Sequence, residues 1–263
     1  MAINIGTSRL HYVIHGEGVP VVLLHGSRVD HHLMTGCFEP IFACENGYRR
    51  IYPDLPGMGQ SVPGEGITDD TAIVDVLLQF IDAVVGDERF LLVGESFGGQ
   101  LARGLIERAS DRILGALFLC PYISDIPQTP PPRQVRITDE RLMASLPKEQ
   151  KTMFEAVSVV QTKDTLAAFT ADIGAYLHLA NNAYIDALGQ TLTFDRTRRY
   201  LFPVSFITGR QDHWTGYEGA FALLPCYPNA SFAVLDCAGH NLQLEQRESF
   251  RALVLEWLGR VDN

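Results

Sequence analysis

One eight-residue stretch, 92–99, constrains the fold of this chain more than any other part. It reads Leu-Val-Gly-Glu-Ser-Phe-Gly-Gly. The apolar run at 90–93 predicts a buried strand, and the apolar spacing over 98–109 predicts a helix. A strand that turns directly into a helix leaves no room for side chains beside the turn, and the two glycines around the serine meet that need. Ser96 is therefore expected on a sharp strand-to-helix turn with its hydroxyl exposed.

The same turn offers what a nucleophilic serine needs. Phe97 begins the helix, so its N–H has no acceptor within the helix, and the positive end of the helix dipole points to the same place. An oxyanion formed beside Ser96 would be stabilised there. The alternative is a glycine-rich turn with an ordinary serine, because G-x-S-x-G also occurs by chance. The nucleophile hypothesis therefore depends on partners elsewhere in the chain.

Those partners are a base and an acid. A serine hydroxyl becomes a good nucleophile when a neighbouring base takes its proton and a carboxylate holds that base in the right tautomer. Asp212 and His240 each lie in a loop directly after a predicted strand. The carboxyl ends of parallel strands meet at one sheet edge, so both residues can converge with Ser96. We predict that Ser96, His240 and Asp212 are catalytic.

Three nearby residues leave alternatives. Asp125, after the strand that follows the serine's helix, is a rival acid, but the Gly-x-x-Asp turn that leaves a buried strand favours Asp212. Glu95 flanks the serine, and the sequence leaves open whether it is buried and paired or faces the pocket. Cys120, at a strand end, is expected to fill apolar space rather than to act as a second nucleophile.

The apolar run at 19–24 predicts a strand buried on both faces of a parallel sheet. It ends in His25, Gly26 and Ser27, which brings the N–H of Ser27 to the carboxyl edge. We expect the N–H groups of Ser27 and Phe97 to form the oxyanion hole. His25 and Gly26 are expected at the substrate site, with His25 shaping the loop rather than acting as a base.

Predicted strands alternate with predicted helices, so the fold class is α/β with a doubly wound, mostly parallel sheet. The pattern changes over 123–201, which begins with a proline-rich linker and shows no convincing strand. We expect a core of residues 1–122 and 202–263, with a helical cap of residues 123–201 inserted after the sixth strand. The helical candidates in this cap segment are 148–160, 163–178 and 181–189.

Two local expectations concern the remaining polar and helical residues. The 30–45 segment predicts a mediocre helix that Gly36 and Pro40 interrupt. His213, adjacent to Asp212, is expected in a solvated loop. Surface or cap positions are expected for His11, His15, His31, His32 and His178.

Composition limits the partners. The formal net charge of −10 at pH 7 disfavours nucleic acid and an anionic membrane surface as partners. No run of about 18 apolar residues is present to span a membrane, and the N-terminus lacks a secretory pattern. The five cysteines lack C-x-x-C pairs, which argues against a disulfide framework or a zinc site and favours a reducing cytoplasm. We expect a small-molecule substrate and neither cofactor nor metal, and the sequence leaves open whether the chain forms a homodimer.

Taken together, these motifs resemble the α/β-hydrolases over essentially the whole chain. The order Ser96, Asp212, His240 matches that family's order of nucleophile, acid and base. The His-Gly-Ser strand end and the Asp-x-Pro-Gly-x-Gly-x-Ser loop at 54–61 also match, and 123–201 occupies the place of the family's variable cap. The resemblance implies acyl transfer through a covalent acyl-enzyme.

The resemblance leaves the substrate open. A serine at position 96 disfavours the dehalogenase and epoxide hydrolase branches, and Phe97 in place of threonine gives no support to the perhydrolase branch. Asn241, where carbon–carbon bond hydrolases often carry tryptophan, weakens that alternative. We expect a serine hydrolase, carboxylesterase-like, that cleaves small or medium uncharged acyl esters beneath an apolar cap. The alternatives are a carbon–carbon bond hydrolase, a lyase and a slow-turnover ligand receptor.

Overall fold

The computed structural model describes residues 1–127 and 129–261, and its centre is one eight-stranded sheet. The pairs β1–β2 and β2–β4 are antiparallel and the remaining neighbours are parallel, which confirms the predicted α/β class with a mostly parallel sheet. Across the sheet, the strands are β1 (Ala2–Ile5), β2 (Ser8–His15), β4 (Tyr48–Pro53), β3 (Val19–Leu24), β5 (Phe90–Glu95), β6 (Ile113–Leu119), β9 (Val204–Gly209) and β10 (Ala230–Leu235).

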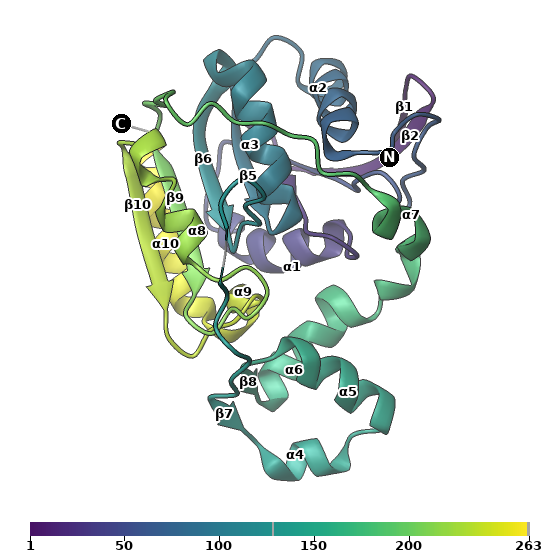
Figure 1. The fold of residues 1–263 in the computed structure, drawn as a ribbon, viewed down its shortest axis with the longest axis vertical. Helices are drawn as coiled ribbons and strands as arrows, with labels where there is room; N and C mark the ends of the chain where they lie inside the picture. Colours follow the sequence, from purple (N-terminus) through teal and green to yellow (C-terminus); the bar gives the residue numbers. More distant parts are fainter. Residues whose placement is uncertain (128, 262–263) are drawn as a thin grey trace.

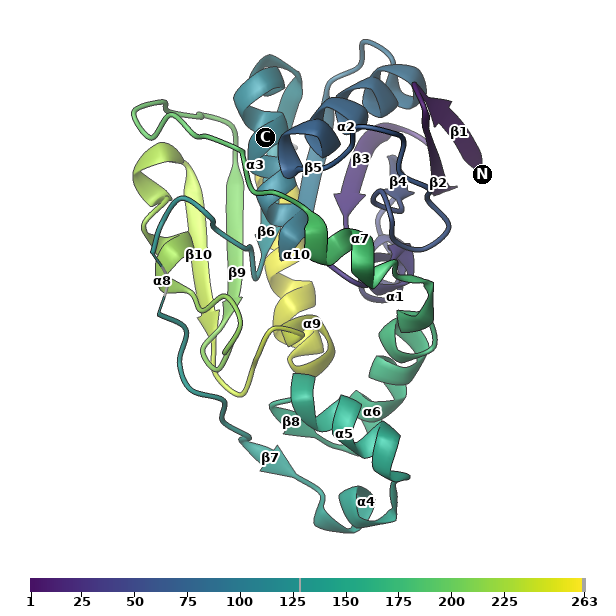
Figure 2. The ribbon, with the colours of Figure 1, turned by 45° about the vertical axis from the view of Figure 1, so that its right-hand side comes forward.

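Helices cover both faces of this sheet (Figures 1 and 2). One buried cluster joins the sheet to α2 (Asp70–Val85), α3 (Phe97–Ala109) and α8 (Glu218–Phe221). The cluster on the other face joins it to α1 (His31–Phe42) and α10 (Arg247–Val261). Central strands such as β5 alternate between the two clusters and are apolar on both sides, which explains their continuous apolar runs.

The predicted interruption of the helix at 30–45 is wrong. The helix α1 runs unbroken through Gly36 and Pro40. Asp30 caps it by accepting a hydrogen bond from the N–H of His32 at 3.0 Å, and its apolar side is buried against the sheet. Pro40 lies near the end of the helix and removes one N–H donor from it, a cost that the buried apolar side of α1 outweighs.

The last described part of the chain packs on the same face as α1. It forms two helices, α9 (Leu242–Glu245) and α10, with Gln246 between them. Two short 3₁₀ turns, at Ser110–Arg112 and Leu224–Cys226, complete the core. Among the described residues, no helix is both long and apolar enough to cross a membrane.

The segment between β6 and β9 contains α4 (Glu140–Ser145), α5 (Lys148–Val157), α6 (Lys163–Phe169) and α7 (Asn182–Ala187). A π-helical turn at Thr170–Gly174 and a 3₁₀ turn at Leu177–Leu179 follow α6. In Figure 1, α4, α5 and α6 lie beyond the arrowheads of β6, β9 and β10.

This segment also holds a two-stranded parallel sheet of β7 (Ile137–Thr138) and β8 (Val160–Gln161), where the sequence indicated no strand. Two residues per strand are too few to produce a recognisable alternation, so the pairing depends on tertiary contacts. Phe154 and Phe169 belong to the same buried cluster as α1 and α10, so the cap segment shares a hydrophobic core with the sheet. Its division from the rest at residues 122 and 202 stays a prediction.

Candidate active site

Ser96 lies between β5 and α3 with φ 50° and ψ −117°. A Cβ atom on Gly94 would lie 2.4 Å from the carbonyl oxygen of Gly98, and one on Gly98 would lie 2.4 Å from that of Leu24. Both glycines are therefore required by the close approach of strand and helix. A backbone conformation of this kind costs about 1–3 kcal/mol and persists because the packed elements around it impose it.

The loops after β9 and β10 bring Asp212 and His240 together. Asp212 Oδ2 accepts a hydrogen bond from His240 Nδ1 at 2.8 Å and another from Thr215 Oγ1 at 2.7 Å. Its Oδ1 atom accepts from the backbone N–H groups of Trp214, at 2.9 Å, and Thr215, at 3.1 Å. The carboxylate is fully buried and all four donors fix its orientation. Such a pair holds the imidazole with Nδ1 protonated.

Electrostatics follow from this geometry. Burial alone would raise the pKa of Asp212, but the His240 and Thr215 contacts outweigh burial and lower it to about 2. Burial opposes a charged His240, yet Asp212 and Glu95 outweigh it and raise the pKa of the imidazole to about 9. The contacts of Asp212 therefore favour its ionised form at neutral pH, and the two carboxylates beside His240 favour a protonated imidazole.

Glu95, which the sequence left open, is both buried and paired. Its Oε1 atom lies 3.3 Å from His240 Nε2, and the residue also lines the pocket in front of Ser96. The rival acid Asp125 lies elsewhere and accepts a hydrogen bond from Arg103 at 2.7 Å. Of the two aspartates, Asp212 is the one that contacts the imidazole.

In the loop after β3, His25 holds the expected loop-shaping position, whereas its expected place at the substrate site is not found. Its side chain is fully buried, with Nδ1 2.7 Å from the carbonyl oxygen of Gly26 and Nε2 accepting from the N–H of Leu55 at 2.9 Å. Both ring nitrogens therefore join two loops and are not free to bind substrate. Gly26 and Ser27, in contrast, line the pocket that contains Ser96.

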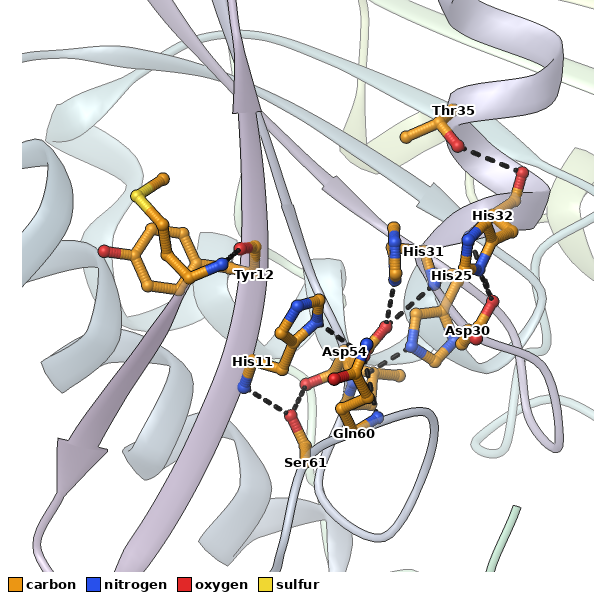
Figure 3. A network of polar contacts seen from close by, with 12 residues as sticks. His11, Tyr12, His25, Asp30, His31, His32, Thr35, Asp54, Gln60 and Ser61 are labelled. Atoms are coloured by element: carbon orange, nitrogen blue, oxygen red, sulfur yellow. Dashed lines mark hydrogen bonds and ion pairs between the residues drawn. The ribbon is translucent and has the colours of Figure 1, made fainter. Parts of the chain in front are cut away.

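The 54–61 loop is held by its buried aspartate (Figure 3). Asp54 Oδ1 lies 2.7 Å from His31 Nδ1, and Oδ2 lies 2.9 Å from His11 Nδ1 and accepts from the N–H of Gln60 at 2.9 Å. These contacts outweigh burial and hold the pKa of Asp54 well below its usual range. The expectation that His31 lies at the surface or in the cap is wrong, because pairing with Asp54 compensates for its burial.

His11, His31 and Asp54 also bring one potential metal-ligand atom each to within 4.8 Å of one another. In the structure, the two Nδ1 atoms are hydrogen-bonded to the carboxylate, which is a complete arrangement without an ion. A second such group combines Cys120 with Asp212 and His240. There Asp212 and His240 are hydrogen-bonded to each other, and Cys120 Sγ donates to the carbonyl oxygen of Gly239, so hydrogen bonds within the protein account for this group as well.

Two pockets meet at Ser96 and His240. The larger, of about 470 Å³, is mostly apolar, and its cap-segment lining comes from α5, α6 and the two turns after α6. Those cap residues are Met153, Ala156, Val157, Phe169, Ile173 and Leu177. The smaller pocket, of about 280 Å³, is bounded by Ser27, Phe97, Tyr122, Ile185, Leu188, Gly189, Gln190, Trp214 and Thr215. Both candidate oxyanion donors therefore lie on the wall of the smaller pocket.

Three residues near the site were missed from the sequence. The Trp214 ring lies 4.9 Å from the His240 ring and lines both pockets. Thr215 binds Asp212, and its position three residues after the aspartate is a capping pattern that local sequence could have revealed. Glu245 accepts from the N–H groups of Gly239, at 2.6 Å, and Val159, and so ties the histidine loop to the cap segment. No local pattern marks that contact.

Comparison with known proteins identifies the family. The family model described as "Alpha/beta hydrolase family" matches residues 21–253. The chain is 26% identical over 256 residues to a 2-hydroxymuconate semialdehyde hydrolase of Pseudomonas putida, covering 94% of this chain and 89% of that protein.

Solved structures show the same fold over the full length. The crystal structure of an alpha/beta superfamily hydrolase from Oenococcus oeni PSU-1 superimposes with a TM-score of 0.89 at 27% identity and covers 100% of both chains. A thermophilic esterase from Thermogutta terrifontis has a TM-score of 0.70 at 20% identity, also over 100% of both chains, and shows the fold alone. The residues matched by the family model include most of the sheet, the strand-to-helix turn at Ser96 and the loop of His240, and this chain belongs to the alpha/beta hydrolase family.

Proposed function

We propose that this protein is a serine hydrolase of uncharged, largely apolar acyl esters, with Ser96 as nucleophile, His240 as base and Asp212 as acid. The observation that carries the proposal is the 2.8 Å Asp212–His240 hydrogen bond at the wall of a pocket that Ser96 also lines. Nucleophile, base and orienting carboxylate are the groups that acyl transfer requires.

In the proposed reaction, Ser96 Oγ forms a bond to the acyl carbon while its proton passes to His240 Nε2. The electron pair of the carbonyl moves to oxygen, which the N–H groups of Ser27 and Phe97 stabilise. The intermediate collapses when the bond to the leaving group breaks and His240 returns its proton to that group. Water then repeats the sequence on the acyl-enzyme, with Asp212 holding the imidazole throughout.

The two pockets suggest how the substrate lies. The larger one, lined by cap-segment side chains, suits an apolar acyl chain, and the smaller suits the leaving group beside the oxyanion donors. Arg28 is the basic side chain in the larger pocket and it is already hydrogen-bonded to Asn182 and ion-paired with Asp186. An anionic acyl group would therefore lose hydration without gaining a free cation.

A second candidate is carbon–carbon bond hydrolysis. It is favoured by the similarity to the 2-hydroxymuconate semialdehyde hydrolase, which extends over nearly the whole of both chains. The same three residues would serve it. Loss of absorbance of a ring-cleavage product on incubation with the enzyme would support this candidate, whereas ester turnover without that loss supports the esterase.

Covalent labelling tests the nucleophile. Wild-type protein should react with a fluorophosphonate probe, and Ser96→Ala should lose this labelling and several orders of magnitude in kcat, because the three residues act as a unit. Ser27→Ala is the matched control, since it removes a hydroxyl from the same pocket and keeps its backbone N–H, so labelling should remain. Labelling that survives in Ser96→Ala would refute the assignment.

Steady-state kinetics separate the other possibilities. A burst of p-nitrophenol from p-nitrophenyl acetate without further turnover would favour a ligand receptor, and product without acyl-enzyme would favour a lyase.

We place the enzyme in the reducing cytoplasm as part of this proposal, because all five cysteines are free thiols. A small-molecule substrate is its proposed partner, and sedimentation would show whether it forms a homodimer.

A further inference from the structure

Glu95 occupies a place that ordinary packing does not explain. The residue is 2% exposed, and it lies at the end of β5, one position before Ser96. A Cβ atom on Gly26 would lie 2.1 Å from Glu95 Oε2, so the carboxylate packs directly against the backbone of the loop after β3. Its other oxygen, Oε1, is the atom 3.3 Å from His240 Nε2. A buried carboxylate is costly unless it is paired, and the imidazole is its charged partner.

The contact gives His240 a carboxylate at each ring nitrogen. Nδ1 faces Asp212 and Nε2 faces Glu95. An imidazolium has two N–H donors and satisfies both carboxylates. A neutral imidazole that donates from Nδ1 would present its Nε2 lone pair to the oxygen of Glu95. An ionised Glu95 therefore favours the charged ring, in agreement with the raised pKa of His240.

Acyl transfer by Ser96 needs a neutral imidazole with no proton on Nε2. Ser96 can give its proton only to an unprotonated Nε2 atom. Within the described residues, His240 has side-chain partners in Asp212, Thr215 and Glu95, and a hydrogen bond from Ser96 is not among them.

We propose that Glu95 is a positioning residue that competes with Ser96 for Nε2 of His240 and holds the unliganded enzyme as an imidazolium between two carboxylates. This inference rests on the proposed function, since it concerns the base of the same reaction. The proton on Nε2 must leave to solvent before the Ser96 proton can take its place. Oγ then bonds to the acyl carbon, and the proton it loses is the one that the leaving group finally receives. Glu95 thereby sets the pH above which the enzyme acts.

Other titratable groups near the pair bear on this pH dependence. Asp212 stays ionised, and burial raises the pKa of the nearby thiols well above their usual range, so these thiols remain neutral. Burial also raises the pKa of Glu95 to about 7 and that of Glu245 to about 7. Among the described residues that act on His240, Glu95 and Glu245 are therefore the two carboxylates that titrate in this range, and the test must separate them. The groups facing the pair are Asp212, His213, Glu245, Cys37 and Cys120.

The test measures the rate constant of fluorophosphonate labelling between pH 5.5 and 10 in wild-type enzyme and Glu95→Gln. Glutamine keeps the shape and removes the charge, so the midpoint of the rising limb should fall by about one pH unit or more. Glu95→Asp keeps the charge but withdraws it from Nε2, and its midpoint should lie between the two. Glu245→Gln removes a second carboxylate that does not contact the ring, and its shift should be smaller than that of Glu95→Gln.

An unchanged or raised midpoint in Glu95→Gln would overturn the proposal, as would an equal shift in Glu245→Gln. If Glu95→Gln does not fold, nitrogen-15 NMR of histidine-labelled wild-type enzyme decides the question, with His240→Gln assigning the signal. Protons on both ring nitrogens at pH 7 support the competition, and a neutral ring overturns it. Failure of wild-type protein to label would count against Ser96 as nucleophile, a separate result from any shift in midpoint.

Discussion

Asp212→Asn is the change whose outcome the structure specifies in most detail. The side-chain oxygen of the asparagine can still accept the two hydrogen bonds that the backbone N–H groups of Trp214 and Thr215 donate to Asp212 Oδ1. Its amide nitrogen then faces His240 Nδ1 and Thr215 Oγ1, where a donor replaces an acceptor. The imidazole must present a lone pair at Nδ1, which leaves its proton on Nε2. Glu95 accepts from that Nε2–H and stabilises the unreactive tautomer further.

The structure gives an expected size for the loss of stability and for the loss of kcat in Asp212→Asn. The pKa of Asp212 falls from 3.8 to about 2 on folding, a shift that stabilises the native state by roughly 2 kcal/mol at pH 7. Because the native pKa is depressed, this stabilisation is present above pH 4 or so and is lost as pH falls through about 2. The wrong tautomer should lower kcat by about 10⁴, near 5 kcal/mol in activation free energy. The catalytic loss therefore exceeds the stability loss.

The assay is kcat with p-nitrophenyl acetate at pH 8, together with thermal melting. We expect Asp212→Asn to melt about 4–8 °C lower and to remain folded at 25 °C. Asp125→Asn is the matched control, because it removes a carboxylate from the partly buried Arg103 ion pair and should keep kcat. If Asp125→Asn loses kcat, or if Asp212→Asn keeps it, the choice of acid is wrong.

Two further predictions concern the pocket and Glu245, the partly buried carboxylate at the end of α9. In a p-nitrophenyl ester series, kcat/KM should rise about fourfold per methylene, or about 0.8 kcal/mol, until the 470 Å³ pocket is full. Ala156→Phe, at an exposed position on that pocket's wall, should move the optimum to shorter chains, and a flat profile would refute the apolar pocket. Burial raises the pKa of Glu245 from 4.5 to about 7, so the folded state binds more protons than the unfolded state in this window and stability should fall as pH rises through it. Glu245→Gln should reduce that slope in melting temperature between pH 4.5 and 7.5, and an unchanged slope would contradict the assignment.

The sequence by itself determined the sheet and the order of the groups at its edge. Strands buried on both faces carry nearly continuous apolar runs, so β3, β5 and β6 could be recognised from local composition. The glycines around Ser96 are required by the strand-to-helix turn, which is also a local property. Because parallel strands end at one edge, residues that follow different strands, such as Asp212 and His240, could be expected to meet.

Tertiary structure alone decided which side chains touch. The sequence shows that Glu95 is adjacent to Ser96. Its contact with His240 depends on a loop 145 positions further along the chain. His31 was expected at the surface or in the cap, and its burial at the start of α1 depends on Asp54, a residue of the 54–61 loop. Glu245 likewise binds backbone N–H groups of the cap segment, which no local pattern specifies. Apolar periodicity and turn chemistry depend on a few neighbouring residues, so they can be recognised in the sequence. The pairing of buried charges depends on distances between segments that only the folded chain brings together.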